Sequence, residues 1–157
     1  MAEPRLLLTC GLPGAGKTTG AVRLAADRPA VRLSKDEWQW ELGSTPWDRD
    51  LGQRLERQLV GLAAELLERG VSVVLDFGLW ARDERDELRE MARAAGVGVE
   101  LHLFDAPIEE LWRRVELRNQ SAPWNRAPIA WSDLSEWSEV FERPDDDELA
   151  LFDTPPS

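Results

Sequence analysis

Apolar residues along this chain form two alternating patterns, short unbroken runs and longer stretches in which apolar side chains recur with helical spacing. The short runs predict buried strands over residues 5–10, 30–33, 71–76 and 97–104. The longer stretches predict helices over residues 17–27, 48–69, 82–95, 107–119 and 133–142. This alternation predicts an α/β fold, in which a parallel sheet is covered by helices on both faces.

Local signals set the ends of two helices near the middle of this pattern. Ser34 and Glu37 have the spacing of a capping box, in which the Glu37 side chain reaches back to the Ser34 amide. They predict a short helix that ends at Gly43. Thr45 as the cap and Pro46 as the first helical residue are expected to open the long helix.

The last third of the chain is less regular. A segment rich in proline, asparagine and tryptophan, about 119–131, predicts a short lid. An acidic C-terminal tail covers about 144–157, and residues 144–148 within it are expected to form a solvent-exposed turn. Residues 149–152 predict a short fifth strand at the edge of the sheet.

The first predicted strand leads through a glycine-rich turn into the first helix. Residues 11–18 match G-x-x-x-x-G-K-T, the pattern of a phosphate-binding loop. Glycines let the backbone bend so that successive N–H groups and the helix N-terminus point at phosphate oxygens. The sequence therefore predicts that the chain binds ATP, since no guanine-reading motif follows. The residues expected to hold the nucleotide are Gly11, Pro13, Gly14, Ala15, Gly16, Lys17, Thr18 and Thr19.

Two aspartates follow predicted strands at the edge where ligands bind in parallel sheets. Asp76 ends the third strand and, with the Thr18 hydroxyl, is expected to hold the Mg²⁺ ion of the nucleotide. Asp36 follows the second strand and is expected to accept the proton of an attacking hydroxyl group. Two alternatives stay open, because Asp76 can instead cap the next turn and Asp36 can simply complement a helix dipole.

Two arginines one helical turn apart lead into the predicted lid. Arg114 and Arg118 are expected to close on the phosphates and to stabilise charge in the transition state, together with Lys17. The alternative is a solvated pair bound to neighbouring glutamates. Arg82 and Arg85 are weaker candidates for the same positive site.

Composition limits the classes of protein to consider. A chain of 157 residues fits one domain, and it has neither a membrane-length apolar run nor a signal-peptide pattern, so we expect a cytoplasmic protein. The single cysteine, Cys10, is expected to be a small core residue, and His102 within a strand is expected to be structural. The formal net charge of −11 argues against a nucleic-acid partner.

The chain resembles the P-loop kinases that include bacteriophage polynucleotide 5′-kinase, chloramphenicol phosphotransferase and the zeta-type toxin kinases. The shared features are the glycine-rich loop, Asp36, Asp76 and the sequence Phe-Asp-Ala-Pro-x-Glu-Glu-Leu-x-x-Arg-x-x-x-Arg at 104–118. The resemblance implies a three-layer P-loop NTPase fold with strand order 2-3-1-4, with Asp36 as base and both arginines in the lid. Gln39 is a departure, because polynucleotide kinases carry an arginine there that helps to bind the acceptor.

Several tryptophans fall near the predicted acceptor site or in the lid, and they indicate an acceptor other than a bare sugar unless they serve ordinary packing. These residues are Trp38, Trp40, Trp47, Trp80, Trp124 and Trp131. The leading hypothesis is an ATP-dependent kinase for a hydroxyl group of a small molecule. The alternatives are a 5′-hydroxyl kinase acting on nucleic acid, and an ATP-binding switch or slow ATPase that has no acceptor.

Overall fold

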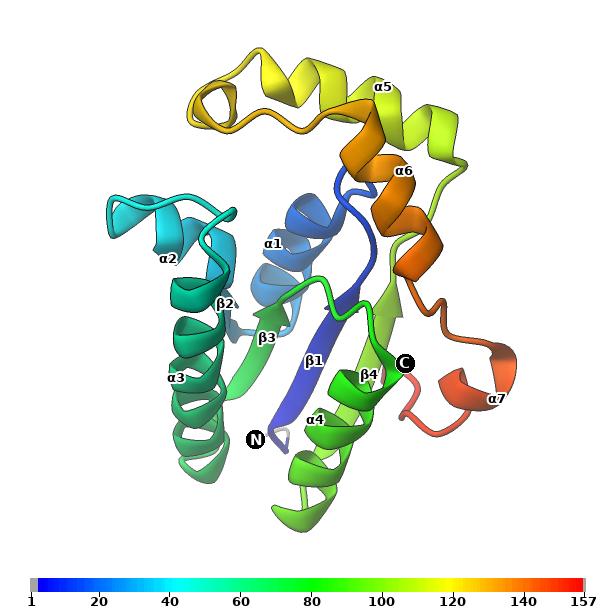
Figure 1. The fold of residues 1–157 in the computed structure, drawn as a ribbon. Coiled ribbons are helices and arrows are strands. Elements are labelled where there is room, and N and C mark those ends of the chain that lie inside the picture. The colour runs from blue at the N-terminus through cyan, green and yellow to red at the C-terminus, as the bar shows by residue number, and fades with distance from the viewer. Residues whose placement is uncertain (1–2, 157) are drawn as a thin grey trace.

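A parallel sheet of four strands forms the centre of the computed structural model, which describes residues 3–156 (Figure 1). The strands are β1 (Arg5–Cys10), β2 (Ala30–Ser34), β3 (Ser72–Asp76) and β4 (Gly98–Leu103). Their order, β2-β3-β1-β4, confirms the expected 2-3-1-4 arrangement, and each lies within one residue of its predicted bounds. The register sets Leu7 of β1 beside Val74 of β3 and Glu100 of β4.

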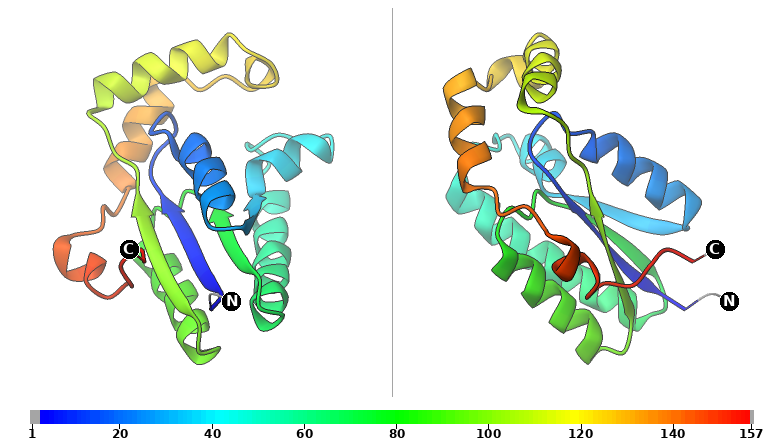
Figure 2. Two further views of the ribbon diagram at one scale, coloured as in Figure 1. Left: turned by 180° about the vertical axis from the view of Figure 1, so that it is seen from behind. Right: turned by 90° about the vertical axis from the view of Figure 1, so that its right-hand side faces the viewer.

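Helices surround this sheet on both faces and extend beyond its carboxyl edge. They are α1 (Lys17–Asp27), α2 (Lys35–Glu41), α3 (Arg49–Glu68), α4 (Arg82–Ala94), α5 (Ile108–Asn119), α6 (Trp131–Val140) and α7 (Asp146–Leu149), with a 3-10 turn η1 (Trp124–Arg126). Figure 2 shows α1 on one face, α3 and α4 on the other, and α5 and α6 beyond the strand ends. None of the helices in the described part of the chain is long and apolar enough to cross a lipid bilayer.

Alternate residues of β1 pack on opposite sides of the sheet. Leu6 and Leu8 are fully buried in the larger core, which also contains side chains of α3 and α4. Leu7 packs with Ala21 and Val74 in a smaller core under α1. The sheet is therefore the middle layer of three, and the predicted arrangement of helices on both faces is confirmed.

A buried carboxylate, Glu100, occupies the α1 side of β4. It accepts hydrogen bonds from Arg5 (2.7 Å) and Arg28 (2.9 Å), and its other contact is His102 Nε2 at 3.0 Å. Burial raises the pKa of Glu100, but the hydrogen bonds from Arg28, Arg5 and His102 outweigh this effect and hold the pKa at about 2. His102 is thus part of a structural cluster, in agreement with the expectation.

Replacing Glu100 with glutamine is expected to change how stability depends on pH. The folded-state pKa lies below the ordinary value of 4.5, so the stabilisation is present above pH 4.5 and is lost as the pH falls toward 2. Over that window the free energy of unfolding of the wild type should fall by on the order of 3 kcal/mol, and that of Glu100→Gln should not show this fall. Chemical denaturation at neutral and acidic pH measures the difference. The exposed Glu90→Gln is the control, and an acid-induced loss in Glu100→Gln equal to that of the wild type would contradict the assignment.

The long helix begins later than predicted. Asp48 is the N-cap of α3, and its carboxylate accepts a hydrogen bond from the Leu51 amide at 3.1 Å. Thr45 and Pro46 precede the helix, so the prediction of Thr45 as cap and Pro46 as first helical residue is wrong. The carboxylate of Asp48 satisfies a free amide and complements the helix dipole, and this favours it as the cap.

The acidic tail also differs from expectation. Residues 149–152 form no strand, because they comprise the end of α7 and the turn after it. Asp145 caps α7 through the Glu148 amide at 2.8 Å, and Phe152 is buried in the main core. Glu148 is 1% exposed, so the prediction of a solvent-exposed acidic turn is wrong at this position.

Glu148 is buried because it pairs with Arg85 of α4. Arg85 Nε donates to one Glu148 oxygen at 2.6 Å and Nη2 to the other at 2.9 Å, and both side chains are almost fully buried. Arg85 also donates to the Leu79 carbonyl at 2.7 Å. This arginine clamps the C-terminal segment to α4, so the suggestion that it adds charge at a phosphate site is wrong. Arg82 lies near Asp86 at 3.7 Å and does not line the pocket described below.

Candidate active site

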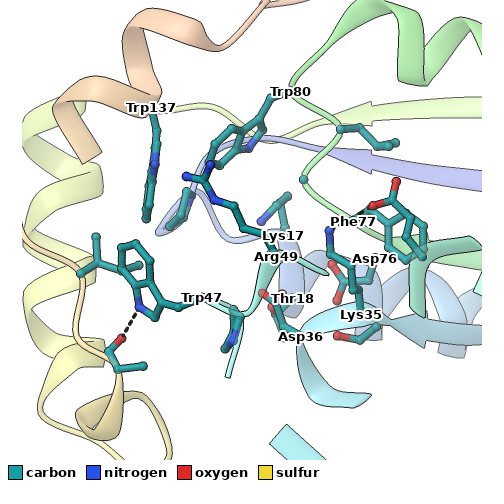
Figure 3. Close-up of a pocket in the computed structure, with 18 of the residues that line it drawn as sticks. Lys17, Thr18, Lys35, Asp36, Trp47, Arg49, Asp76, Phe77, Trp80 and Trp137 are labelled. Atoms are coloured by element: carbon teal, nitrogen blue, oxygen red, sulfur yellow. Dashed lines mark hydrogen bonds and ion pairs between the residues drawn. The ribbon is translucent and has the colours of Figure 1, made fainter. Parts of the chain in front are cut away.

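A pocket of about 560 Å³ opens at the carboxyl edge of the sheet, where the segments after β1, β2 and β3 meet (Figure 3). Lys17 and Thr18 reach it from the start of α1, Asp36 from α2, and Asp76 from the end of β3. Arg118 of α5, one residue before the segment that the sequence predicts as a lid, completes this group. Residues far apart in the sequence are thus brought to one edge, as the parallel sheet requires.

The glycine-rich loop owes its shape to backbone angles that other residues rarely adopt. Gly14 and Gly16 have φ values of 85° and 93°, and a Cβ at Gly14 would lie 2.7 Å from the Leu111 carbonyl oxygen. Of the eight residues expected to hold nucleotide, Pro13, Lys17 and Thr18 line the pocket. The other five form the turn itself and the first turn of α1, where backbone amides rather than side chains would contact phosphate.

Lys17 lies in the field of two carboxylates. Burial of its ammonium group lowers the pKa of Lys17, while Asp36 and then Asp76 raise it. The three side chains line the same pocket, so a bound phosphate chain would share the charge of the Lys17 amine with these two acids.

Asp76 is fixed by neighbours on the adjacent strands. Its Oδ2 accepts a hydrogen bond from Arg32 of β2 at 2.9 Å, and its Oδ1 lies 3.4 Å from the Thr9 hydroxyl. Burial raises the pKa of Asp76, and Lys17 and Arg32 oppose that rise. Arg32 was not among the predicted site residues, because one arginine in a short edge strand gives no functional signal.

Asp36 and Glu37 are neighbours at the start of α2, but their side chains have different surroundings. The Ser34 hydroxyl accepts a hydrogen bond from the Glu37 amide at 3.3 Å, as the capping box predicts. The Glu37 carboxylate pairs with Arg32 rather than with the Ser34 amide, so that half of the predicted capping box is wrong. Asp36 lines the pocket and Glu37 does not. This arrangement favours Asp36 as the group that meets an acceptor hydroxyl.

The two predicted lid arginines occupy different places. Arg118 lines the pocket, its guanidinium lies 4.0 Å from the centre of the Trp124 ring, and its buried Nε has no hydrogen-bond partner among residues 3–156. Burial lowers the pKa of Arg118 and Asp36 raises it. Arg114 lies outside the pocket, where it donates to the Gly14 carbonyl at 3.1 Å and pairs with Glu110 at 3.0 Å. Of the two predicted arginines, only Arg118 lines the pocket.

Some of the predicted tryptophans line the pocket and others do not. Trp47, Trp80 and Trp124 line the pocket. The three other predicted tryptophans, Trp38, Trp40 and Trp131, do not line it. A tryptophan that the sequence did not single out, Trp137 of α6, does line it. Its spacing from Leu134 and Phe141 is that of an ordinary apolar helix face, so no signal distinguished it.

Gln39 has a structural role that accounts for the departure from the polynucleotide kinases. Its side chain is 1% exposed, and its Nε2 donates to the carbonyls of Thr45 and Asp48 at 3.0 Å each. The amide thereby fixes the turn between α2 and α3. Gln39 does not line the pocket.

The strand order and the glycine-rich loop that joins β1 to α1 define a P-loop NTPase-like protein with a kinase-like arrangement of strands. The chain belongs to a family described as an AAA domain, whose family model matches residues 6–144. Among curated proteins, no match was found.

Solved structures similar to this chain include several P-loop kinases. A gluconokinase from Sinorhizobium meliloti 1021 is 19% identical, with a TM-score of 0.64 over 94% of this chain and 80% of the other. Chaetomium thermophilum Kti12 in complex with ADP-AlF3 is 19% identical, with a TM-score of 0.67 over 89% and 81%. A chain of the Pnkp1/Rnl/Hen1 RNA repair complex is 21% identical, with a TM-score of 0.67 over 90% of this chain but only 45% of that one. These similarities confirm the resemblance to P-loop kinases at the level of the fold.

Proposed function

We propose that this protein is an ATP-dependent kinase that transfers the γ-phosphate to a hydroxyl group of a small molecule. The observation that carries the proposal is the convergence of Lys17, Thr18, Asp36, Asp76 and Arg118 on one pocket at the carboxyl edge of the sheet. Phosphoryl transfer needs a cradle for the phosphates, charge to stabilise the transition state and a group that orients the attacking hydroxyl, and this pocket has a candidate for each.

The nucleotide end of the pocket has the groups that ATP and Mg²⁺ require. Loop amides and Lys17 would hold the β- and γ-phosphates. The Thr18 hydroxyl and the Asp76 carboxylate are the hard oxygen donors that Mg²⁺ prefers, so this pair fits the metal, which would neutralise charge on the transferring group. Arg32 holds Asp76 in place for this role.

At the acceptor end, the proposed base is Asp36, which lines the same pocket as Lys17 and Thr18. Asp36 would orient the hydroxyl and take its proton as the hydroxyl oxygen bonds to the γ-phosphorus and the bond to the β–γ bridging oxygen breaks. Arg118 would balance the charge on the transferring group, as its orphaned Nε and its position in the pocket suggest. Arg114 would support the loop from outside through Gly14.

Replacing Asp36 with asparagine is expected to lower kcat for phosphate transfer on the order of 10²-fold. Nucleotide affinity should change little, because Asp36 orients the acceptor rather than the phosphates. The measurement is radiolabelled phosphate incorporation with an acceptor found by screening hydroxylated metabolites and antibiotics, alongside calorimetry with Mg·ATP. Glu37→Gln is the matched control one residue away, since its carboxylate pairs with Arg32 outside the pocket. If Asp36→Asn transferred phosphate at the wild-type rate, Asp36 would not be the base.

A second candidate, a 5′-hydroxyl kinase for nucleic acid, is favoured by the structural similarity to the RNA repair complex. Two observations weigh against it. The net charge is −11, and Gln39 is buried where an acceptor-binding arginine would be needed. Phosphorylation of a 5′-hydroxyl oligonucleotide, with binding that weakens steeply as salt increases, would establish this function instead.

A further inference from the structure

Three tryptophan rings that line the pocket contact one another and form a continuous wall. Trp137 lies between the other two, with ring centres 5.5 Å from Trp47 and 5.5 Å from Trp80 (Figure 3). The rings come from three separate segments: the turn before α3, the loop after β3, and α6. We call these three residues the tryptophan wall.

Two of the three rings in the tryptophan wall are held in place through their indole N–H groups. The Trp47 indole N–H donates to the Ala127 carbonyl at 3.3 Å, and the Trp80 indole N–H donates to the Gly11 carbonyl at 3.1 Å. Both ring N–H groups are thereby satisfied by backbone, so what these two rings offer a ligand is their apolar surface. A rigid apolar ring surface binds at little cost in side-chain entropy.

The backbone before Trp80 is shaped to deliver its ring to this position. Leu79 has a φ of 50°, in the left-handed region that non-glycine residues rarely adopt. Gly78 precedes it, and a Cβ there would lie 2.8 Å from Trp80 Nε1. The loop therefore combines a costly backbone conformation with a glycine that leaves room for the indole.

Resting on the proposed kinase function, we propose that the acceptor is an alcohol that carries a planar aromatic or heteroaromatic ring. The ring would stack against the tryptophan wall, while the hydroxyl, on a short arm, would reach Asp36 beside Lys17 in the same pocket. The Trp80 indole is hydrogen-bonded to the Gly11 carbonyl of the phosphate loop. A ligand ring that stacks on Trp80 would therefore contact a residue that is attached to this loop.

The test compares two probes of similar size, benzyl alcohol and cyclohexylmethanol, on protein loaded with Mg²⁺ and the β,γ-imido analogue of ATP. Saturation-transfer NMR and calorimetry should show tighter binding of benzyl alcohol, since only its ring can stack. Trp137→Leu and Trp47→Leu should each weaken benzyl alcohol binding about 3- to 10-fold. Trp47→Leu is included because Trp47 is 41% exposed, and its loss should not impair folding.

Trp38→Leu is the matched control, because Trp38 is also 41% exposed but lies outside the pocket, and its benzyl alcohol affinity should equal that of the wild type. The inference is overturned if cyclohexylmethanol or glucose binds as tightly as benzyl alcohol, if Trp38→Leu shows the same loss, or if benzyl alcohol fails to bind at tens of millimolar.

Phosphate incorporation separates this inference from the proposed function. If only non-aromatic acceptors are phosphorylated, the kinase function stands and the aromatic acceptor is wrong. If benzyl alcohol binds the tryptophan wall as expected but no hydroxylated compound gains phosphate, the wall stands as a ring-binding site and the kinase function is wrong.

Discussion

Replacing Lys17 with alanine is expected to lower the rate of phosphate transfer by at least the same factor as Asp36→Asn, on the order of 10²-fold or more. The transition state of phosphoryl transfer is loose, so positioning and charge on the phosphates matter more than removal of the acceptor proton. Lys17 lines the pocket, and Asp36 and Asp76 both favour its charged form, so its loss removes the positive charge that is expected to meet the phosphates. Steady-state kinetics with varied ATP should show a fall in kcat together with weaker nucleotide binding.

The control for Lys17→Ala is Arg23→Ala, which removes a positive charge from the exposed face of the same helix. That variant should retain wild-type kinetics. Near-full turnover by Lys17→Ala would contradict the proposed site. A wild-type protein that gives no heat with millimolar Mg·ATP or Mg·GTP would contradict nucleotide binding altogether.

The parts of this structure that could be predicted are those set by local sequence. Apolar runs bounded by glycine or an acid gave strand ends to within one residue, and the glycine-rich loop needs only its own spacing to be recognised. Asp36 and Asp76 followed from one rule, that ligands bind at the carboxyl ends of parallel strands, and both line the pocket. The order of the strands came from the resemblance to P-loop kinases, since periodicity alone does not order a sheet.

The parts that could not be predicted depend on contacts between distant segments. Arg85 and Glu148 are separated by 63 positions, and nothing in the sequence near either residue indicates that the fold buries the two together. Trp137 looks like a core residue of α6, and only the approach of Trp47 and Trp80 makes it part of a pocket wall. Arg114 and Arg118 share one helix flank, yet Arg114 donates to the Gly14 carbonyl and only Arg118 of the two lines the pocket.

Replacing Glu148 with glutamine is expected to lower the free energy of unfolding by about 3–5 kcal/mol. The substitution leaves the Arg85 guanidinium buried without its counter-ion, and a buried unpaired charge costs several times more than a lost surface ion pair. Chemical denaturation at neutral pH measures the change. The control is Arg54→Gln, which breaks an exposed pair with Asp50 and should leave the denaturation midpoint unchanged.

The double variant Arg85→Met with Glu148→Leu separates the unpaired charge from lost packing. Removing both partners eliminates the buried charge, so the double variant should be more stable than Glu148→Gln. It should still lose activity, because Arg85 also bonds the Leu79 carbonyl at 2.7 Å and the Glu142 carbonyl at 2.7 Å. Those bonds fix the loop that carries Trp80 into the pocket. A double variant as unstable as Glu148→Gln would show that packing, rather than the buried charge, explains the loss.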